Sequence, residues 1–383
     1  MIDPSEMALL PTGLQDVLPP DAAHEAATGE ALLARIALSG YERVKPPLVE
    51  FEDGLLAGAG AGLADQTFRL MDPVSRRMMA VRSDVTPQVA RIATSRLAKA
   101  PRPLRLSYSG DILRVQGSEL RPERQFRQVG YELIGPAAVA GDAEVVLLAA
   151  DALRSVGVDG LSVDLNAPTL VTAVLENLSL ATEEARALRA AIDRKDEAGV
   201  RALGGVAAEP LMALFGAVGT AGPALEKLAA IELPGGARQA ADALANVADL
   251  VMAGAPDLPV TVDPVEHRSF EYHTGTSFTM FAQGVRGELG RGGRYAVGAG
   301  AAAETATGCT LYLDSVLRAV PARAAAPRIF VPAGISRDTI TGLQAEGWVT
   351  VVGLEVVDDP REEGLRLACT HVWIDGGTQP LDS

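Results

Sequence analysis

Residues 110–135 read GDILRVQGSELRPERQFRQVGYELIG, and this stretch decides the fold. Residues 112–115 and 128–133 are suited to strands, and residues 117–124 between them have the Gly, Ser, Pro and charged residues of a long hairpin loop. We therefore predict two antiparallel strands joined by a basic loop.

Polar side chains of this hairpin are predicted to converge on one ligand. Gln128 and Glu132 share a face of the second strand, because successive side chains alternate between faces, and Arg114 leaves the first strand beside them. An arginine clamps a carboxylate or phosphate, and a glutamate accepts from an ammonium or an imidazole N–H. The set favours a zwitterionic ligand, whereas in an isolated hairpin solvated surface charges would be the simpler interpretation.

Composition narrows the function classes. The 383 residues allow more than one domain, and 34 basic against 49 acidic residues give a net charge of -15. Such a charge disfavours broad nucleic-acid binding, although the basic loop could still hold a phosphate. No apolar run is long enough to span a membrane and no signal pattern opens the chain, so we expect a cytoplasmic location.

Metal and cofactor sites are not predicted. Cys309 and Cys369 are too few for a disulfide framework or a zinc cluster and are expected to be buried thiols. The four histidines show no metal-binding spacing. The GxGxG in residues 54–65 lacks the acidic partner of a dinucleotide site and is expected to form a flexible loop.

The order of elements predicts an α+β protein. Residues 1–321 carry hairpins typical of an antiparallel core flanked by helices, with a helical insertion at about residues 168–254. Residues 286–290 are predicted as a strand, residues 290–295 (GRGGRY) as a turn and residues 299–307 as a loop, followed by a helix over 311–320. After a linker at 321–327, residues 328–383 alternate strands and helices, which predicts a small C-terminal α/β domain with a parallel sheet.

Five segments, in order, resemble histidyl-tRNA synthetase, a class II aminoacyl-tRNA synthetase. They are PTGLQDVLP (11–19), RSDVT (82–86), the hairpin at 110–135, HRSFEYHTGTSF (267–278) and GRGGRY (290–295). A single glycine-rich turn would carry little weight, but five ordered matches are specific. The resemblance implies a class II synthetase-like antiparallel sheet flanked by helices, and a dimer formed through the N-terminal segment.

The resemblance also implies a pocket for histidine, in which polar side chains face the ammonium group and the imidazole ring. Asp84 and Gln128 would face the α-ammonium group, Thr86 would support it, and Glu132 would accept from the imidazole ring. The pocket makes physical sense with a ligand present, because buried charges are tolerated only when they are paired.

The other side of the implied pocket carries arginines and rings. Arg114 and Arg268 would meet the carboxylate or an activating phosphate, and His273 and Tyr295 would close the pocket around the imidazole. Each of these residues taken alone would more simply be a surface ion pair or a satisfied core group.

Departures from the synthetase pattern predict that aminoacylation is lost. Gln116 stands where the synthetases carry a glutamate that grips ATP, Ser315 where a helix delivers an arginine to the triphosphate, and Tyr312 in place of a glycine. Without a cation at position 315, charge on the triphosphate loses a major stabiliser. The acidic tail after the linker is also too short for an anticodon-binding domain, so no tRNA partner is expected.

This combination resembles the synthetase-like regulatory subunits of ATP phosphoribosyltransferase. It implies no catalytic residues, a short-form catalytic subunit as partner, histidine as effector, and a homodimer within a hetero-octamer that acts in the first step of histidine biosynthesis. Two other hypotheses stay open. One is a divergent histidyl-tRNA synthetase or amino-acid ligase that still adenylates histidine, favoured by the retained Arg114 and Arg268. The other is a stand-alone histidine-sensing module.

Overall fold

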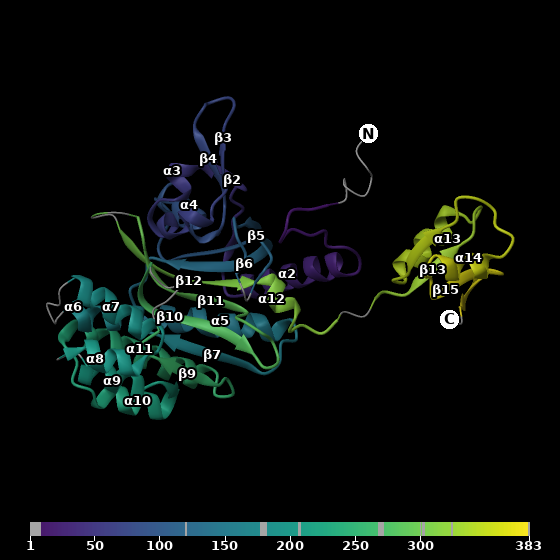
Figure 1. Cartoon of the computed structure of the whole chain (residues 1–383). Coiled ribbons are helices and arrows are strands. Elements are labelled where there is room, and N and C mark those ends of the chain that lie inside the picture. The colour runs from purple at the N-terminus through teal and green to yellow at the C-terminus, as the bar shows by residue number, and fades with distance from the viewer. Residues whose placement is uncertain are drawn as a thin grey trace. The chain divides into compact units, whose positions relative to one another are not determined.

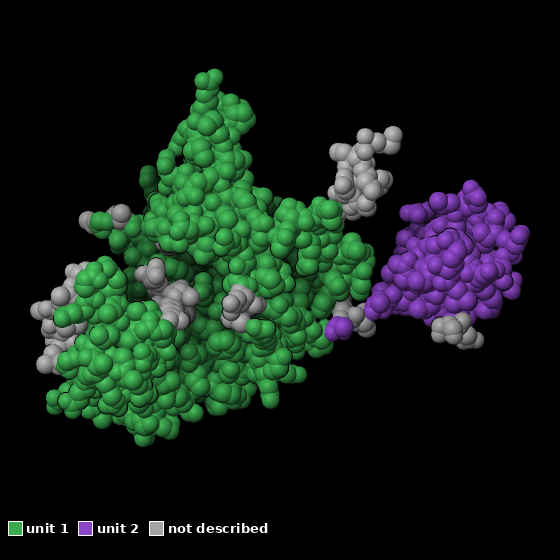
Figure 2. All heavy atoms as spheres, in the orientation of Figure 1, with its two compact units in different colours: residues 1–321 green, residues 322–383 purple. Residues whose placement is uncertain are grey.

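The computed structural model describes residues 9–118, 121–176, 182–205, 208–266, 272–298, 300, 303–322 and 325–381. The chain divides into two compact units, residues 1–321 and 322–383, which Figure 2 colours separately. Among the described residues, no helix has the length and apolar character needed to cross a membrane.

A nine-stranded sheet forms the centre of the first unit (Figure 1). Its strands, in spatial order, are β1 (Glu42–Arg43), β5 (Leu104–Leu113), β6 (Gln125–Ile134), β12 (Glu304–Tyr312), β11 (Gly290–Val297), β10 (His273–Ala282), β7 (Leu161–Asn166), β9 (Val260–Asp263) and β8 (Gly219–Thr220). Neighbouring strands are antiparallel from β5 through β6, β12, β11 and β10 to β7. Strand β1 runs parallel to β5, and β9 runs parallel to β7. The predicted antiparallel core is therefore present, with a parallel pair on each side.

Helices and a small second sheet surround this centre. The segment predicted as a helical insertion contains α6 (Pro168–Glu176), α7 (Thr182–Asp193), α8 (Glu197–Leu203), α9 (Ala208–Gly216), α10 (Ala221–Ala230) and α11 (Gly235–Gly254). The other helices are α2 (Asp21–Ala37), α3 (Glu52–Leu55), the 3-10 helix η1 (Gly58–Gln66), α4 (Thr86–Thr94), α5 (Val139–Ser155) and α12 (Leu313–Leu317). Strands β2 (Val49–Phe51), β4 (Met78–Val81) and β3 (Arg69–Met71) form the three-stranded sheet.

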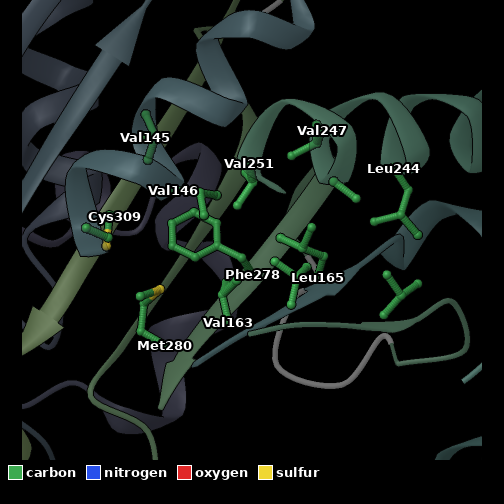
Figure 3. Packing of buried hydrophobic residues seen from close by; sticks show 14 of the residues in the cluster. Val145, Val146, Val163, Leu165, Leu244, Val247, Val251, Phe278, Met280 and Cys309 are labelled. Atoms are coloured by element: carbon green, nitrogen blue, oxygen red, sulfur yellow. The ribbon is translucent and has the colours of Figure 1, made fainter. Parts of the chain in front are cut away.

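One face of the large sheet carries the main hydrophobic core. Phe278 and Met280 of β10 pack with apolar residues of β7 and with the buried sides of α5 and α11 (Figure 3). Each such side chain stabilises the fold by roughly 1.5–3 kcal/mol when fully buried. Cys309 lies in this core and Cys369 in the second unit, and both are buried free thiols as predicted.

The opposite face of the sheet is mixed in character. Its apolar residues, such as Leu106 and Ile134, pack with Val89 of α4. Polar side chains occupy the positions between them. The hydrophobic core on the other face fixes the register of the strands, because a shift by one residue would exchange the two faces. The core thus determines which polar groups meet on this side.

Two glycine-rich segments and the small-residue segment 299–307 were predicted incorrectly. Residues 290–295 form most of β11 rather than a turn, and the strand predicted over 286–290 is wrong because residues 286–289 lie before β11. Strand β12 begins at Glu304 within the predicted loop. The reason is close packing, since a Cβ added at Gly292 would lie 2.0 Å from the carbonyl oxygen of Gly308 on β12. Residues 54–65 lie largely in α3 and η1, where a Cβ at Gly60 would lie 2.1 Å from the oxygen of Leu55. The predicted helix over 311–320 is limited to α12.

The second unit has a four-stranded sheet in the order β14 (Val349–Val352), β13 (Arg328–Val331), β15 (His371–Ile374) and β16 (Gly377–Pro380), with helices α13 (Arg337–Ala345) and α14 (Pro360–Arg366). Strands β13, β14 and β15 are parallel as predicted. Strand β16 was not predicted and pairs antiparallel with β15. Asp375 and Gly376 both have positive φ, as a tight hairpin turn requires, so the Asp-Gly pair was the missed signal.

Candidate functional site

The β5–β6 hairpin places the predicted polar residues on the mixed face of the sheet. The register pairs Gly110 with Gln128 and Leu106 with Glu132, so the two polar side chains point away from the main core. Both are fully buried. The prediction that Gln128 and Glu132 share one face is confirmed by this register.

Asp84, Thr86 and Gln128 form a connected hydrogen-bond network at the start of α4. The Gln128 Nε2 donates to Asp84 Oδ2 at 3.0 Å, and its Oε1 accepts from the Val85 backbone N–H at 3.0 Å. Asp84 Oδ1 accepts from the Thr86 backbone N–H at 2.9 Å. The network holds the carboxylate of Asp84, which is only partly buried, at a fixed place beside Thr86.

Glu132 is a buried acid surrounded by hydroxyl groups. Its carboxyl accepts from Tyr295 Oη at 2.8 Å and from Thr86 Oγ1 at 3.0 Å. Burial raises the pKa of Glu132 to about 8, while the two hydroxyl donors oppose that rise. Near pH 7 the side chain is therefore largely protonated, and a positively charged ligand beside it would favour the ionised carboxylate.

Glycines on β12 and β6 make room for this acid. A Cβ added at Gly308 would lie 1.7 Å from Glu132 Oε2, and one at Gly130 would lie 2.4 Å from the Tyr108 hydroxyl. Tyr108 in turn hydrogen-bonds Thr310 at 2.8 Å. The glycines act here through the absence of a side chain, because any larger residue would displace Glu132 or Tyr108.

A small cavity lies next to Glu132. We call it the Glu132 pocket, and it is lined by Thr86, Glu132, Tyr272, His273, Arg291, Gly292, Gly293, Tyr295, Gly308 and Thr310. The space open to the centre of a water molecule is about 10 Å³, enough for about one water. The Tyr272 ring stacks on His273 at 4.2 Å and meets Tyr295 edge-on at 5.8 Å, so aromatic side chains fill much of the pocket.

The structure thus brings together Asp84, Thr86, Gln128, Glu132, His273 and Tyr295. Arg114 lies outside the Glu132 pocket, where its Nε donates to the Ser83 carbonyl at 3.4 Å and its guanidinium lies 5.2 Å from the Phe126 ring centre. Arg268 falls outside the described residues.

The expectation that position 315 has no cation nearby is wrong. Arg121 Nη2 donates to Ser315 Oγ at 3.0 Å, and its Nε donates to Asp314 Oδ2 at 2.9 Å. The guanidinium also lies 4.0 Å from the centre of the Tyr312 ring. Arg318 donates to the same Ser315 oxygen at 2.8 Å. We call this group of five residues the Ser315 cluster.

Internal contacts neutralise the cation in the Ser315 cluster. The Arg121 and Asp314 side chains are 10% and 17% exposed, so their ion pair is largely shielded from water. Tyr312 is buried beneath Arg121, and burial raises its pKa to about 12. Arg121 is therefore held by a carboxylate, a hydroxyl and a ring of its own chain.

Sequence reasoning missed several residues of the Glu132 pocket. Arg291 was overlooked because residues 290–295 were predicted as a turn. In a strand, Arg291, Gly293 and Tyr295 lie on one face. Strand alternation would therefore have placed Arg291 beside Tyr295, which was already a predicted pocket residue. Tyr272 and Thr310 had no such signal, because their place depends on how β10 and β12 pair with β11.

Comparisons with known proteins give the family. A family model described as histidyl-tRNA synthetase matches residues 13–316. A protein of Paramagnetospirillum magneticum named ATP phosphoribosyltransferase regulatory subunit is 54% identical over 371 residues, which cover 97% of each chain. The chain belongs to the histidyl-tRNA synthetase-like family of ATP phosphoribosyltransferase regulatory subunits. A relative of the same name from Rhodospirillum centenum is 54% identical over 380 residues, covering 99% of this chain and 98% of the relative.

A solved structure supports the fold. It is described as an ATP phosphoribosyltransferase regulatory subunit/histidyl-tRNA synthetase from Bacillus halodurans C. It matches with a TM-score of 0.83 at 23% identity and covers 95% of this chain and 97% of that chain. The predicted class II synthetase-like fold is confirmed by this likeness, and the predicted family by the sequence relatives.

Proposed function

We propose that this chain is a non-catalytic subunit that activates a short-form ATP phosphoribosyltransferase and mediates feedback inhibition by histidine. One contrast carries the proposal. The Glu132 pocket keeps a buried acid and a partly exposed carboxylate for a cationic amino acid, while the cation of the Ser315 cluster is already paired with Asp314. The name shared by the full-length relatives supports the transferase complex as the setting.

The proposed ligand geometry follows from the donors and acceptors of the pocket. Asp84, Gln128 and Thr86 receive the α-ammonium group, and Glu132 accepts from the imidazole. Because the cavity holds about one water, histidine has to displace Tyr272 or His273 on entry. A ligand regulates a partner only if it binds two states with different affinity, and the closed and opened pockets provide two such states.

A reconstitution assay tests the proposal. The full chain is mixed with a short-form catalytic subunit, and phosphoribosyl transfer is measured with and without histidine. We expect stimulation by the chain and inhibition by histidine. The Glu132→Ala variant should still stimulate but respond to histidine only at about 10-fold higher concentration or more.

Glu183→Ala is the matched control, because that glutamate side chain is 82% exposed on α7. It should behave like the wild type. The absence of stimulation by the wild-type chain would overturn the proposal, and stimulation without any histidine effect would overturn the feedback part.

A second function is favoured by one observation, namely that Arg121 reaches Ser315 and so supplies a cation near the implied triphosphate position. In that case the chain would still adenylate histidine. Histidine-dependent exchange of pyrophosphate into ATP measures this directly. We expect no exchange, because Arg121 would first have to leave Asp314. Measurable exchange would establish the adenylating alternative.

A further inference from the structure

Arg291 is one of the residues that line the Glu132 pocket. It lies on β11 between Thr279 of β10 and Thr310 of β12 in the strand register. Two residues further along, Gly293 pairs with Gly308, which itself pairs with Glu132. Arg291 therefore projects from the same face as Glu132 and lines the same cavity.

No side chain of the described residues is bonded to Arg291, although the carboxylates of Glu288 and Asp84 act on it from a distance. Within the described part of the chain, its partly buried guanidinium makes no hydrogen bond and no ion pair within 4.0 Å. Arg294 on the same strand, by contrast, pairs with Asp142 at 2.9 Å and donates to two backbone carbonyls. A partly buried guanidinium whose N–H donors have no hydrogen-bond acceptor in the described chain can still bind an anionic ligand group.

The pocket therefore has two ends of opposite preference. The carboxyl group of Glu132 can pair with a cationic group of a ligand, and the guanidinium of Arg291, which lines the same cavity, can pair with an anionic one. A zwitterion matches this arrangement, because its carboxylate and its cationic groups are held at a fixed short separation. A planar guanidinium binds a carboxylate with two parallel hydrogen bonds.

We infer that Arg291 binds the α-carboxylate of the amino-acid effector and makes the pocket select ligands with a free carboxylate. The inference rests on the proposed function, in which this pocket binds histidine. Arg291 is thus assigned as a specificity-determining residue that adds to the implied set of pocket residues.

Paired titrations test the inference. Histidine and histidinol, which has an alcohol in place of the carboxylate, are titrated calorimetrically into the full chain assembled with a short-form catalytic subunit. Arg291→Gln should weaken histidine binding by about 10- to 100-fold. Histidinol binding should change far less, so the preference for histidine disappears. Arg291→Lys should restore part of the preference, because it keeps the charge without the two-pronged geometry.

Arg286→Gln is the matched control, since Arg286 is exposed in the loop before β11, and it should leave both affinities unchanged. A structural role for Arg291 would weaken both ligands equally and overturn the inference, as would an unchanged preference in Arg291→Gln. If the wild-type assembly binds no histidine, the proposed function itself fails. If it binds histidine and only the variant result is negative, the proposed function survives and the assignment of Arg291 falls.

Discussion

The Ser315 cluster and the Glu132 pocket lie in the same unit but differ in whether their charged side chains are paired within the protein. In the Ser315 cluster, Arg121 is paired with Asp314, bonded to Ser315 and stacked on Tyr312. In the Glu132 pocket, the buried acid receives only hydroxyl donors, and Arg291 has no carboxylate within 4.0 Å among the described residues.

This difference separates a region that is complete without a ligand from one that is not. An internal ion pair satisfies both of its charges, so an added anion gains little there. The protonated Glu132 and the guanidinium of Arg291, which has no ion-pair partner within 4.0 Å among the described residues, can still form hydrogen bonds or ion pairs with a ligand. The family fold is thus kept in both regions, and we propose that a charged ligand binds in the Glu132 pocket rather than at the Ser315 cluster.

The largest effect is expected from breaking the Ser315 cluster. Arg121→Met removes one partner of a shielded ion pair and leaves the partly buried Asp314 without its nearest cation, so the free energy of unfolding should fall by about 3 kcal/mol. Urea denaturation measures this change. Arg186→Met, which breaks an ion pair whose side chains are 68% and 82% exposed, is the control and should cost about 1 kcal/mol or less. Equal losses in the two variants would contradict the internal neutralisation described for Arg121.

The next effect concerns the space beside Glu132. Gly308→Ala forces the Glu132 carboxyl to move, so the free energy of unfolding should fall by about 1–3 kcal/mol and histidine binding should be lost. Gly222→Ala in α10 has no atom within 4 Å of the added Cβ and should be neutral or slightly stabilising. Unchanged unfolding and binding in Gly308→Ala would show that Glu132 is not confined by β12.

The buried acid should also give the protein a pH-dependent stability. Because burial raises the pKa of Glu132 from 4.5 to about 8, the folded state keeps a proton that the unfolded state releases between these values. The free energy of unfolding should therefore fall as pH rises from about 4.5 to 8, by at most about 1.4 kcal/mol per pH unit from this group.

The Glu132→Gln variant should lose this component, as seen by comparing urea denaturation at pH 5.5, 6.5 and 7.5. Glu183→Gln should retain the wild-type slope because its side chain is 82% exposed. Identical slopes in the wild type and Glu132→Gln would show that Glu132 is already ionised across this range.

The smallest effect is expected for the second arginine at Ser315. Arg318 is 41% exposed and lies 4.0 Å from Asp314, so Arg318→Ala should lower the free energy of unfolding by about 1 kcal/mol or less. Measured beside Arg121→Met, it decides which guanidinium neutralises the cluster. A loss as large as that of Arg121→Met would assign the role to both residues.

Part of the site was predictable because it depends on local periodicity. Gln128 and Glu132 are four residues apart on one strand, so their shared face follows from alternation alone. Arg291 obeys the same rule, but the glycines around it are typical of a turn, and the pattern therefore predicts a turn at residues 290–295. Those glycines instead permit β11 and β12 to approach closely and leave room for Glu132.

Contacts between distant segments were not predictable from periodicity. Arg121 comes from the hairpin loop and Ser315 from α12, and their hydrogen bond joins positions 194 residues apart. The substitution at position 315 suggested a missing cation, but only the folded chain brings Arg121 there. Tyr272 likewise reaches the pocket through the pairing of β10 with β11.

The sequence by itself determined the family, the antiparallel hairpin and the identity of the acid and amide on its inner face, because ordered motifs and strand alternation are properties of the chain read in one dimension. Only the tertiary structure decided which charges are paired. Glu132 is buried and Arg121 is neutralised because strands β6, β12 and β11 bring distant residues together, and the free energy of a charge depends on the neighbours that replace water around it.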